Sequence, residues 1–280
     1  MTNNRWWVIG FAALVGLLVG VALTGWQVLP AKEMAARATC ADCHDLHGAI
    51  ELEEAPFQSQ VWLLGDVPST AYFFVNDLFP LANQQRGDQI ALPELLARYG
   101  VTEFERVALQ SLDGGLVVIE RQYVTAESAL VPYLEGLRFR DENQHESTWL
   151  KGVRWIIVAG AEAPLTVDGA STSLGRLMLG GIENVAEGSG QAMFKSPLDE
   201  QIYKAIYTHV HPGAPLRRAL AHPGFATLRV STTGGEVREL GYDIARDAVL
   251  IRLGKELVLA LPNAASRDWV TGVASIESIP

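Results

Sequence analysis

The residues whose types and spacing could carry chemistry lie in one short segment, Cys40-Ala41-Asp42-Cys43-His44, which has the C-x-x-C-H pattern. Two thiols at this spacing can form thioether bonds with the two vinyl groups of one haem, and the adjacent histidine then becomes an axial ligand of the iron. Cys40 and Cys43 are the only cysteines among the 280 residues. The pattern therefore predicts one covalent haem c, with His44 as the proximal iron ligand.

Other uses of the cysteine pair fit less well. A structural zinc site needs four ligands, and two more good ligands are missing near the pair. A thioredoxin-type redox pair needs a surrounding βαβ pattern, which this part of the sequence lacks. Two cysteines also exclude a framework of several disulfides. Covalent haem is the interpretation that remains.

The second axial ligand of the iron must come from outside the motif. Residues 31–56, the predicted haem-binding segment, are too few to enclose a haem, and Met34 and His47 lie too close to the motif to reach the far face of the ring. Met193 is the preferred candidate, because residues 188–194 are glycine-rich and are expected to form a loop. The wider set of candidates comprises Met178, Met193, His145, His209, His211 and His222, of which His209 and His211 come next after Met193.

Residues 6–29 contain no charged side chain. As a helix they would extend for roughly 36 Å, enough to cross a bilayer, which predicts a transmembrane anchor in residues 1–30. A cleaved signal peptide is the alternative, since Ala36-Arg37-Ala38 has the form of a cleavage site. Because bacteria attach haem to such motifs outside the inner membrane, we expect a cytoplasmic N-terminus and a periplasmic C-terminal region. Small residues at a four-residue spacing predict a face for a partner helix, formed by Ala12, Gly16, Gly20 and Thr24.

The formal net charge of the chain is −10. An acidic chain of this kind lacks the basic surface that binds a phosphate backbone. We therefore expect no nucleic acid among its partners.

The remainder of the sequence is rich in strand patterns. Residues 105–110, 116–123 and 153–159 are rich in valine, isoleucine and aromatic residues, and Asp113-Gly114-Gly115 predicts a turn between the first two. Residues 92–99 and 198–208 have short helical patterns.

A shift of 120 residues aligns the chain with itself. Without a gap, Gly114-Gly115 falls on Gly234-Gly235, and Trp149-x-x-Gly152 falls on Trp269-x-x-Gly272. The predicted fold class is thus mainly β (α+β), with one N-terminal transmembrane helix, a short haem-c segment and two tandem β-rich repeats. The repeats are predicted at 57–160 and 161–280, the second with an insertion at about 180–212.

The first repeat resembles the molybdopterin-binding domain of the sulfite-oxidase family. The resemblance rests on the turn at Asp113-Gly114-Gly115, the segment Gly136-Leu137-Arg138 and the segment Lys151-Gly152-Val153-Arg154-Trp155. It implies the fold of that domain and, in principle, a molybdenum cofactor. That family holds its molybdenum through a cysteine thiolate, whereas both cysteines here belong to the haem motif. Molybdopterin is therefore not expected, and the β units are interpreted as a scaffold.

These features together predict an electron-transfer role. A membrane-anchored cytochrome c would relay electrons within a larger membrane redox complex or to another cytochrome, with the β units as a docking scaffold. The alternatives are a structural or assembly subunit, a haem-based sensor, and a molybdopterin-type oxidoreductase. Whether the protein is itself an enzyme stays open at this stage.

Overall fold

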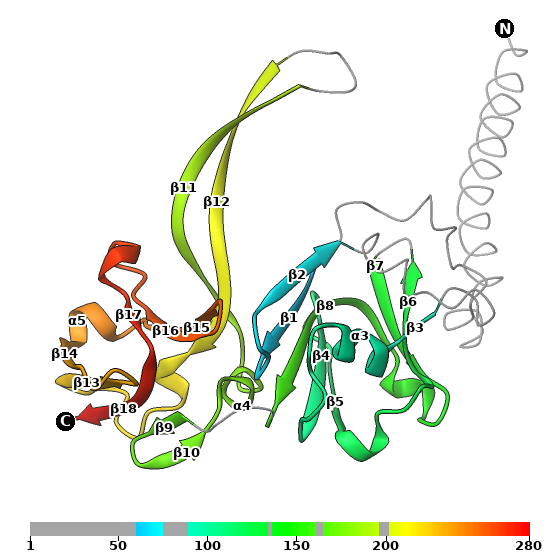
Figure 1. Ribbon diagram of the computed structural model, residues 1–280, viewed down its shortest axis with the longest axis horizontal. Helices are drawn as coiled ribbons and strands as arrows, with labels where there is room; N and C mark the ends of the chain where they lie inside the picture. The colour runs from blue at the N-terminus through cyan, green and yellow to red at the C-terminus, as the bar shows by residue number, and fades with distance from the viewer. Residues whose placement is uncertain (1–59, 75–88, 134–135, 161–164, 196–201) are drawn as a thin grey trace, which may run out of the picture. The chain divides into compact units, whose positions relative to one another are not determined.

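The computed structural model describes residues 60–74, 89–133, 136–160, 165–195 and 202–280. Strands make up most of the described part, and its helices are short (Figure 1). The predicted fold class needs a correction, because no helix among these residues is long and apolar enough to cross a membrane. The segment behind that prediction, residues 6–29 with Ala12, Gly16, Gly20 and Thr24, lies outside the described residues. The fold class that the structure supports is mainly β.

The first half of the described chain forms an eight-stranded sheet with the path β2-β1-β8-β7-β6-β3. Strand β4 pairs with β8, and β5 pairs with β4. Strand β1 runs parallel to β8, with Trp62 opposite Trp155, and the other pairs are antiparallel. The strands are β1 (Gln60–Gly65), β2 (Ala71–Phe74), β3 (Ile90–Ala91), β4 (Arg106–Ser111), β5 (Leu116–Glu120), β6 (Ser128–Tyr133), β7 (Gly136–Asp141) and β8 (Leu150–Ala159), and the short helices are α3 (Leu92–Arg98), η4 (Arg121–Tyr123) and η5 (Glu146–Thr148).

The second half forms two five-stranded sheets, β10-β9-β18-β13-β14 and β11-β12-β15-β16-β17. Strand β9 runs parallel to β18, as β1 does to β8. The strands are β9 (Leu165–Val167), β10 (Ala170–Thr172), β11 (Glu183–Lys195), β12 (Ile202–Pro215), β13 (Thr227–Thr232), β14 (Val237–Gly241), β15 (Val249–Leu253), β16 (Glu256–Ala260), β17 (Val270–Thr271) and β18 (Val273–Ile279), and the helices are α4 (Leu174–Met178), η6 (Leu216–Arg218), α5 (Tyr242–Ala245) and η7 (Ser266–Asp268).

The same order of elements occurs in both halves. The series β4, β5, η4, β6, β7, η5, β8 of the first half corresponds to β13, β14, α5, β15, β16, η7, β17 and β18 of the second. In each half a tryptophan indole donates to the carbonyl eight residues earlier: Trp149 Nε1 lies 3.1 Å from Asp141 O, and Trp269 Nε1 lies 3.2 Å from Leu261 O. Trp269 is buried and Trp149 is half-buried, so the two residues share a position and a hydrogen bond but bury different areas.

The first hairpin of each half corresponds at a shift of 121 residues, one more than the ungapped comparison gives. Gly114 and Gly235 both have a positive φ, +92° and +82°, and each donates its N–H to the carbonyl three residues earlier. The turn geometry therefore aligns Gly114 with Gly235, although the sequence comparison placed it on Gly234. From β6 onward the shift returns to 120, as the paired tryptophans show.

Helix α3 confirms the helical pattern predicted for residues 92–99. Its buried side chains are Leu92, Leu95 and Leu96, at the spacing that places them on one face. Pro93 stands in the first turn, where its missing N–H has no helical partner to lose, and Arg98 lies in the last turn. This buried face joins the core of the first half.

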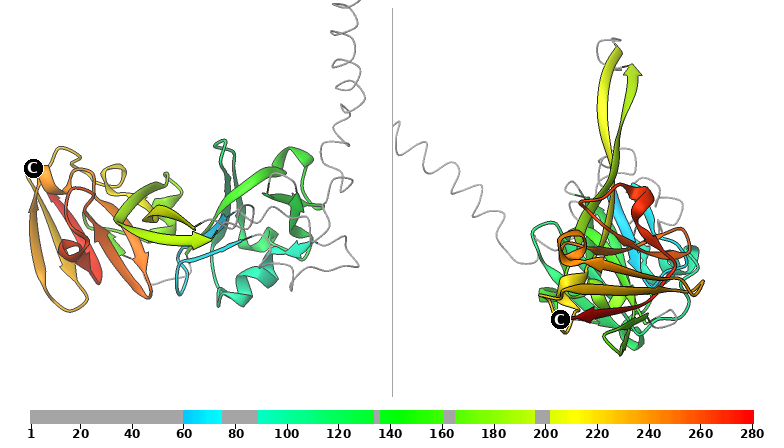
Figure 2. Two further views of the ribbon diagram at one scale, coloured as in Figure 1. Left: turned by 90° about the horizontal axis from the view of Figure 1, so that it is seen from above. Right: turned by 90° about the vertical axis from the view of Figure 1, so that its left-hand side faces the viewer.

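A second predicted helix is wrong. Within residues 198–208, the described part from Ile202 onward belongs to β12, which pairs with β11 along nearly its whole length. The two strands cover most of the range, about 180–212, that was predicted to be an insertion, and they form a long ribbon that extends beyond β15 and β16 (Figures 1 and 2). Only Ala214 and Pro215 of β12 pair with β15. The backbone hydrogen bonds of the ribbon are therefore made mainly between its own two strands.

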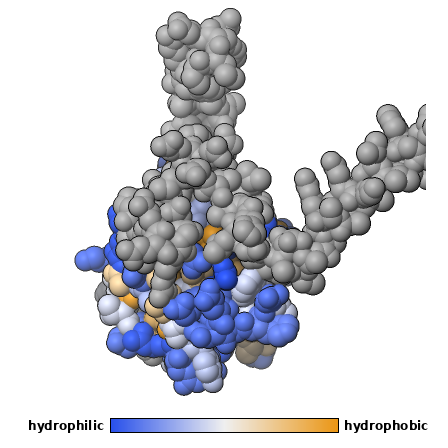
Figure 3. Space-filling view, turned by 90° about the vertical axis from the view of Figure 1, so that its right-hand side faces the viewer, coloured by the Kyte–Doolittle hydropathy of each residue, from blue (hydrophilic) through white to orange (hydrophobic). Residues whose placement is uncertain are grey.

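One of the two apolar cores contains residues of both halves. Leu64, Ala108 and Ile157 of the first sheet belong to the cluster of buried residues that fills the second half, whereas Leu63 and Ile156 belong to the core of the first. The first sheet is thus apolar on both faces, unlike a sheet with one solvated side. Where Figure 3 shows described residues, their surface is mostly hydrophilic, with smaller hydrophobic areas.

An aspartate follows the parallel strand of each half. Asp66, after β1, is only 1% exposed, and its carboxylate accepts the N–H groups of Gly160 at 2.6 Å and Gly175 at 2.9 Å. Asp168, after β9, has a positive φ of +48° and accepts the N–H groups of Ala221 and Ser278 and the Ser278 hydroxyl. Each carboxylate therefore connects the end of its strand to the backbone of two segments that are distant in the sequence.

The hydrogen bonds of Asp168 control its acidity. Burial alone would raise the pKa of this carboxyl, but the donors on Ser278 and Ala221, together with nearby His222, lower the pKa below its ordinary value. A lowered pKa in the folded state means that the carboxylate contributes stability above the unfolded pKa of about 4, and that this contribution is lost as the pH falls through the folded value.

We expect Asp168→Asn to lower the free energy of unfolding by about 1–2 kcal/mol at pH 7, because an amide replaces a charged acceptor of three hydrogen bonds. The deficit should shrink as the pH falls below about 4, since the wild type then loses its carboxylate too. Urea unfolding between pH 7 and pH 2.5 measures both quantities. A deficit that stays constant over this range would contradict the assignment.

Candidate functional site

The three predicted haem-binding residues, Cys40, Cys43 and His44, lie outside the described residues. The structure therefore describes the candidates for the second iron ligand, and two surface hollows, but no geometry of the motif. Among the described residues, no group of three or more His, Cys, Asp or Glu side chains is placed to hold a metal ion.

Met193 lies in a strand, and the prediction of a loop around it is wrong. The backbone of residues 188–195 pairs with that of residues 202–209, so the glycines of this stretch stand within the β11–β12 ribbon. Gly188 and Gly190 pair with His209 and Tyr207, which are much larger residues. A glycine-rich sequence thus forms a strand here, because it pairs with the opposite strand residue by residue.

Met193 and His209 lie on different strands of the ribbon. Met193, in β11, pairs with Lys204, whereas His209, in β12, pairs with Gly188. The backbone positions of the two leading candidates are therefore several residues apart along the ribbon.

His211 is held by the β body. Its Nε2 lies 2.8 Å from Glu187 Oε2, and its ring meets the Trp269 ring edge-on at a centroid distance of 6.3 Å. The His211 side chain is 22% exposed. To bind iron through Nε2, His211 would first have to break its hydrogen bond with Glu187.

The other candidates have ordinary structural positions. Met178 in α4 is only 1% exposed and packs in the shared apolar core, which removes its thioether from any surface site. His145 accepts the N–H of Ser147 and caps η5. His222 is exposed beside Asp168. The described structure therefore does not bring the candidate ligands together.

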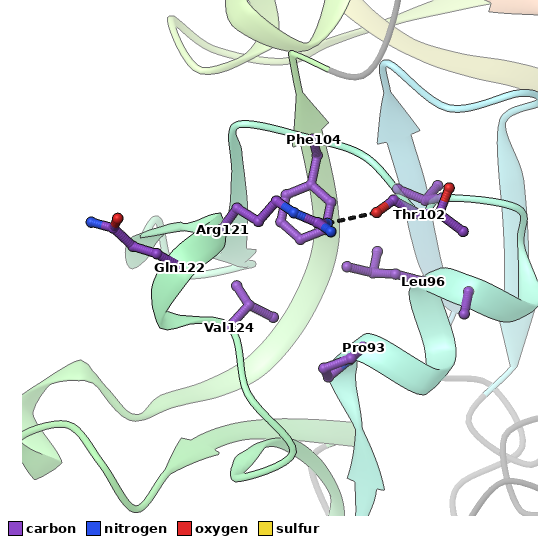
Figure 4. Close-up of a pocket in the computed structure, with 9 residues that line it drawn as sticks. Pro93, Leu96, Thr102, Phe104, Arg121, Gln122 and Val124 are labelled. Atoms are coloured by element: carbon purple, nitrogen blue, oxygen red, sulfur yellow. Dashed lines mark hydrogen bonds between the residues drawn. The ribbon is translucent and has the colours of Figure 1, made fainter.

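A hollow of about 420 Å³ lies between α3, the segment that follows it and η4 (Figure 4). Its floor is apolar and buried, since Leu96 and Val101 are 1% and 4% exposed. Arg121 extends across the ring of Phe104 toward Thr102, whereas Gln122 points away from them (Figure 4). The full lining is Pro93, Leu96, Ala97, Val101, Thr102, Phe104, Arg121, Gln122 and Val124.

A second hollow, of about 470 Å³, adjoins the first through Gln122. Thr125 holds part of its wall in place, because its hydroxyl accepts from Asn143 Nδ2 at 3.2 Å. The residues that line it carry polar groups and include no Asp, Glu, Lys or Arg; they are Gln122, Tyr123, Thr125, Asn143, Gln144 and His145. Its largest apolar surface is Tyr123, which is 58% exposed.

Arg121 and Phe104 are not part of any motif in the sequence. A lone arginine after a strand carries no motif, and the ungapped shift of 120 aligned Arg121 with Gly241. At the shift of 121 that the hairpin geometry gives, Arg121 corresponds to Tyr242 and Phe104 to Phe225. An alignment of the two halves with this one-residue gap would have shown that an arginine in the first half replaces a tyrosine in the second, and could have identified Arg121 as a candidate.

Comparisons with models of known protein families, with curated proteins and with solved structures find no match to this chain. The resemblance of the first half to the molybdopterin-binding domain of the sulfite-oxidase family therefore stays a prediction from the residues alone.

Proposed function

We propose that this protein is a c-type cytochrome that relays electrons within a larger redox complex. The observation that carries the proposal is that the only two cysteines of the chain stand in a C-x-x-C-H motif. Cys40 and Cys43 would hold the haem through thioether bonds, and His44 would bind its iron. The haem supplies a one-electron couple, and the protein sets its potential and its position. The side of the membrane where haem is attached implies a periplasmic location.

The β body is proposed to be the scaffold that docks the cytochrome onto its complex. One of its two buried cores contains residues of both halves, and close packing there would keep the halves together as a support for the haem-binding segment. Residues 60–280 contain no cysteine, so a molybdenum centre of the sulfite-oxidase type has no thiolate to bind there. Met193 stays the proposed second iron ligand, followed by His209 and then His211, which is engaged with Glu187.

The test is to express the full chain in a bacterium that attaches haem c and to purify it in mild detergent. Covalent haem is read by peroxidase staining of the denatured chain, and electron relay by the rate of reduction with a reduced cytochrome or a quinol donor. We expect stained chain and fast, complete reduction. A methionine-to-iron charge-transfer band in the oxidised spectrum is required for Met193.

Other results would replace this proposal. An unstained chain would remove the haem assignment altogether. Stained haem that reduces slowly and binds carbon monoxide would favour a sensor, and stained haem that does neither would favour a structural subunit. Molybdenum in stoichiometric amount would favour an oxidoreductase.

A further inference from the structure

We propose that the hollow between α3 and η4 is a binding site for a small carboxylate that carries an apolar group. The hollow holds about 420 Å³, within the range of pockets that take small ligands. The inference does not depend on the haem, since every residue that it uses lies in the β body.

The lining fixes the chemical class of the ligand. Leu96 and Val101 form a buried floor, and Pro93, Phe104 and Val124 add apolar walls. Arg121 is the only charged residue among the lining residues, and none of them is acidic. One cation beside an apolar floor matches a ligand with one negative charge at one end and an apolar body at the other.

The Arg121 guanidinium is held in place by its neighbours but still has N–H donors that can bind a ligand. Its guanidinium lies 4.9 Å from the centre of the Phe104 ring, and Nη1 donates to Thr102 O at 2.6 Å. Its ion pair with Glu103 is a surface contact, with 3.6 Å between Nη2 and Oε1 and with the Glu103 side chain 81% exposed. A guanidinium has five N–H donors, so a carboxylate in the hollow can take a paired hydrogen bond while Phe104 and Thr102 keep the group in place.

The second half of the chain shows that the fold does not need this charge. Tyr242 stands at the position of Arg121, and its ring packs against Phe225, the counterpart of Phe104, at a centroid distance of 5.3 Å. A neutral aromatic residue therefore fills the same structural place between the same elements. The positive charge at Arg121 is a feature of the first half alone, which is what a binding role predicts.

The test is a ligand-observed NMR titration of the purified full chain with benzoate and with benzamide, which differ in charge but hardly in shape. We expect the wild type to bind benzoate roughly tenfold more tightly than benzamide, because a charge-assisted hydrogen bond contributes about that much. Arg121→Tyr, which copies the second half, should bind the two compounds equally. Arg121→Lys keeps the charge without the planar fork and should keep part of the preference.

Each outcome decides the matter. No preference for benzoate in the wild type, or an undiminished preference in Arg121→Tyr, overturns the proposal. If Arg121→Tyr fails to fold by circular dichroism, the argument from Tyr242 is wrong, and Arg121→Gln then supplies the neutral variant for the same titration. Val124→Trp would fill the hollow and leave the charge of Arg121, so it should weaken the binding of both compounds to the same extent. If this variant binds them as the wild type does, the compounds bind outside the hollow and the proposal is wrong.

Discussion

A variant with both Cys40→Ala and Cys43→Ala is expected to carry no covalently bound haem. The chain has no other cysteine, so no thiol remains to form a thioether bond. Peroxidase staining after denaturing electrophoresis should fall from one haem per chain to background. Each single variant keeps one thiol and should keep a reduced amount of stain.

The matched control is His47→Ala, which changes a histidine beside the motif without touching its pattern. It should stain like the wild type, whereas His44→Ala should alter the visible spectrum of any haem that is attached. Persistent staining of the double variant would remove the haem assignment. Circular dichroism of all these variants should keep the β signal, because all the described strands lie from Gln60 onward.

Local patterns were enough to predict some elements of the β body. The strand-favouring residues of β4 and β5, with a glycine turn between them, and the leucine spacing of α3 each depend on neighbours a few residues away. The structure confirms these elements at nearly the predicted positions. The apolar residues that define the pattern are mostly buried in β4 and α3, whereas in β5 only Ile119 is buried.

The β11–β12 ribbon shows where local patterns fail. Residues 202–208 have a sequence compatible with a helix, and residues 188–195 have the glycines of a loop. Their strand conformation comes from pairing with each other, through contacts between residues as far apart as Glu183 and Gly213. A pairing of this length outweighs intrinsic propensity, which is weak for each residue.

The hollow at Arg121 was missed for a different reason. It is formed by three segments that only the fold brings together, α3, the loop with Phe104 and η4. The comparison of the two halves could have pointed to it, but only with a one-residue gap on either side of the first hairpin. Gly114 and Gly235 both have a positive φ, and this shared backbone conformation shows where the gap belongs. An ungapped sequence alignment contains no information on φ.

Asp66→Ala is expected to lower the free energy of unfolding by about 2–5 kcal/mol. The N–H groups of Gly160 and Gly175 would both lose their acceptor, and each unsatisfied buried donor costs about 1–3 kcal/mol. Asp113→Ala is the matched control, because Asp113 also accepts two hydrogen bonds but lies in an exposed turn. Water can replace the exposed bond from Gly115 N–H, and the Ser111 hydroxyl can still donate to the Gly115 carbonyl, so the effect in urea unfolding should be much smaller. Equal effects of the two variants would show that Asp66 does not hold the two halves together.

Gly175→Ala tests the same contact from the opposite side. A Cβ at Gly175 would lie 1.9 Å from Val158 O and 2.8 Å from the Ala159 Cα, which are backbone atoms that cannot turn aside. Helix α4 would have to move away from β8, and Asp66 would lose the Gly175 N–H in the same movement. We therefore expect a loss of at least about 2 kcal/mol. Adding Asp66→Ala should then cost less than it does alone, because the Gly175 bond is already broken and only the Gly160 bond remains to be lost. Gly224→Ala, where a Cβ meets no atom within 4 Å, should change stability by less than about 0.5 kcal/mol. Additive losses in the double variant would mean that Asp66 and Gly175 contribute separately, and that the carboxylate is not what sets the distance between α4 and β8.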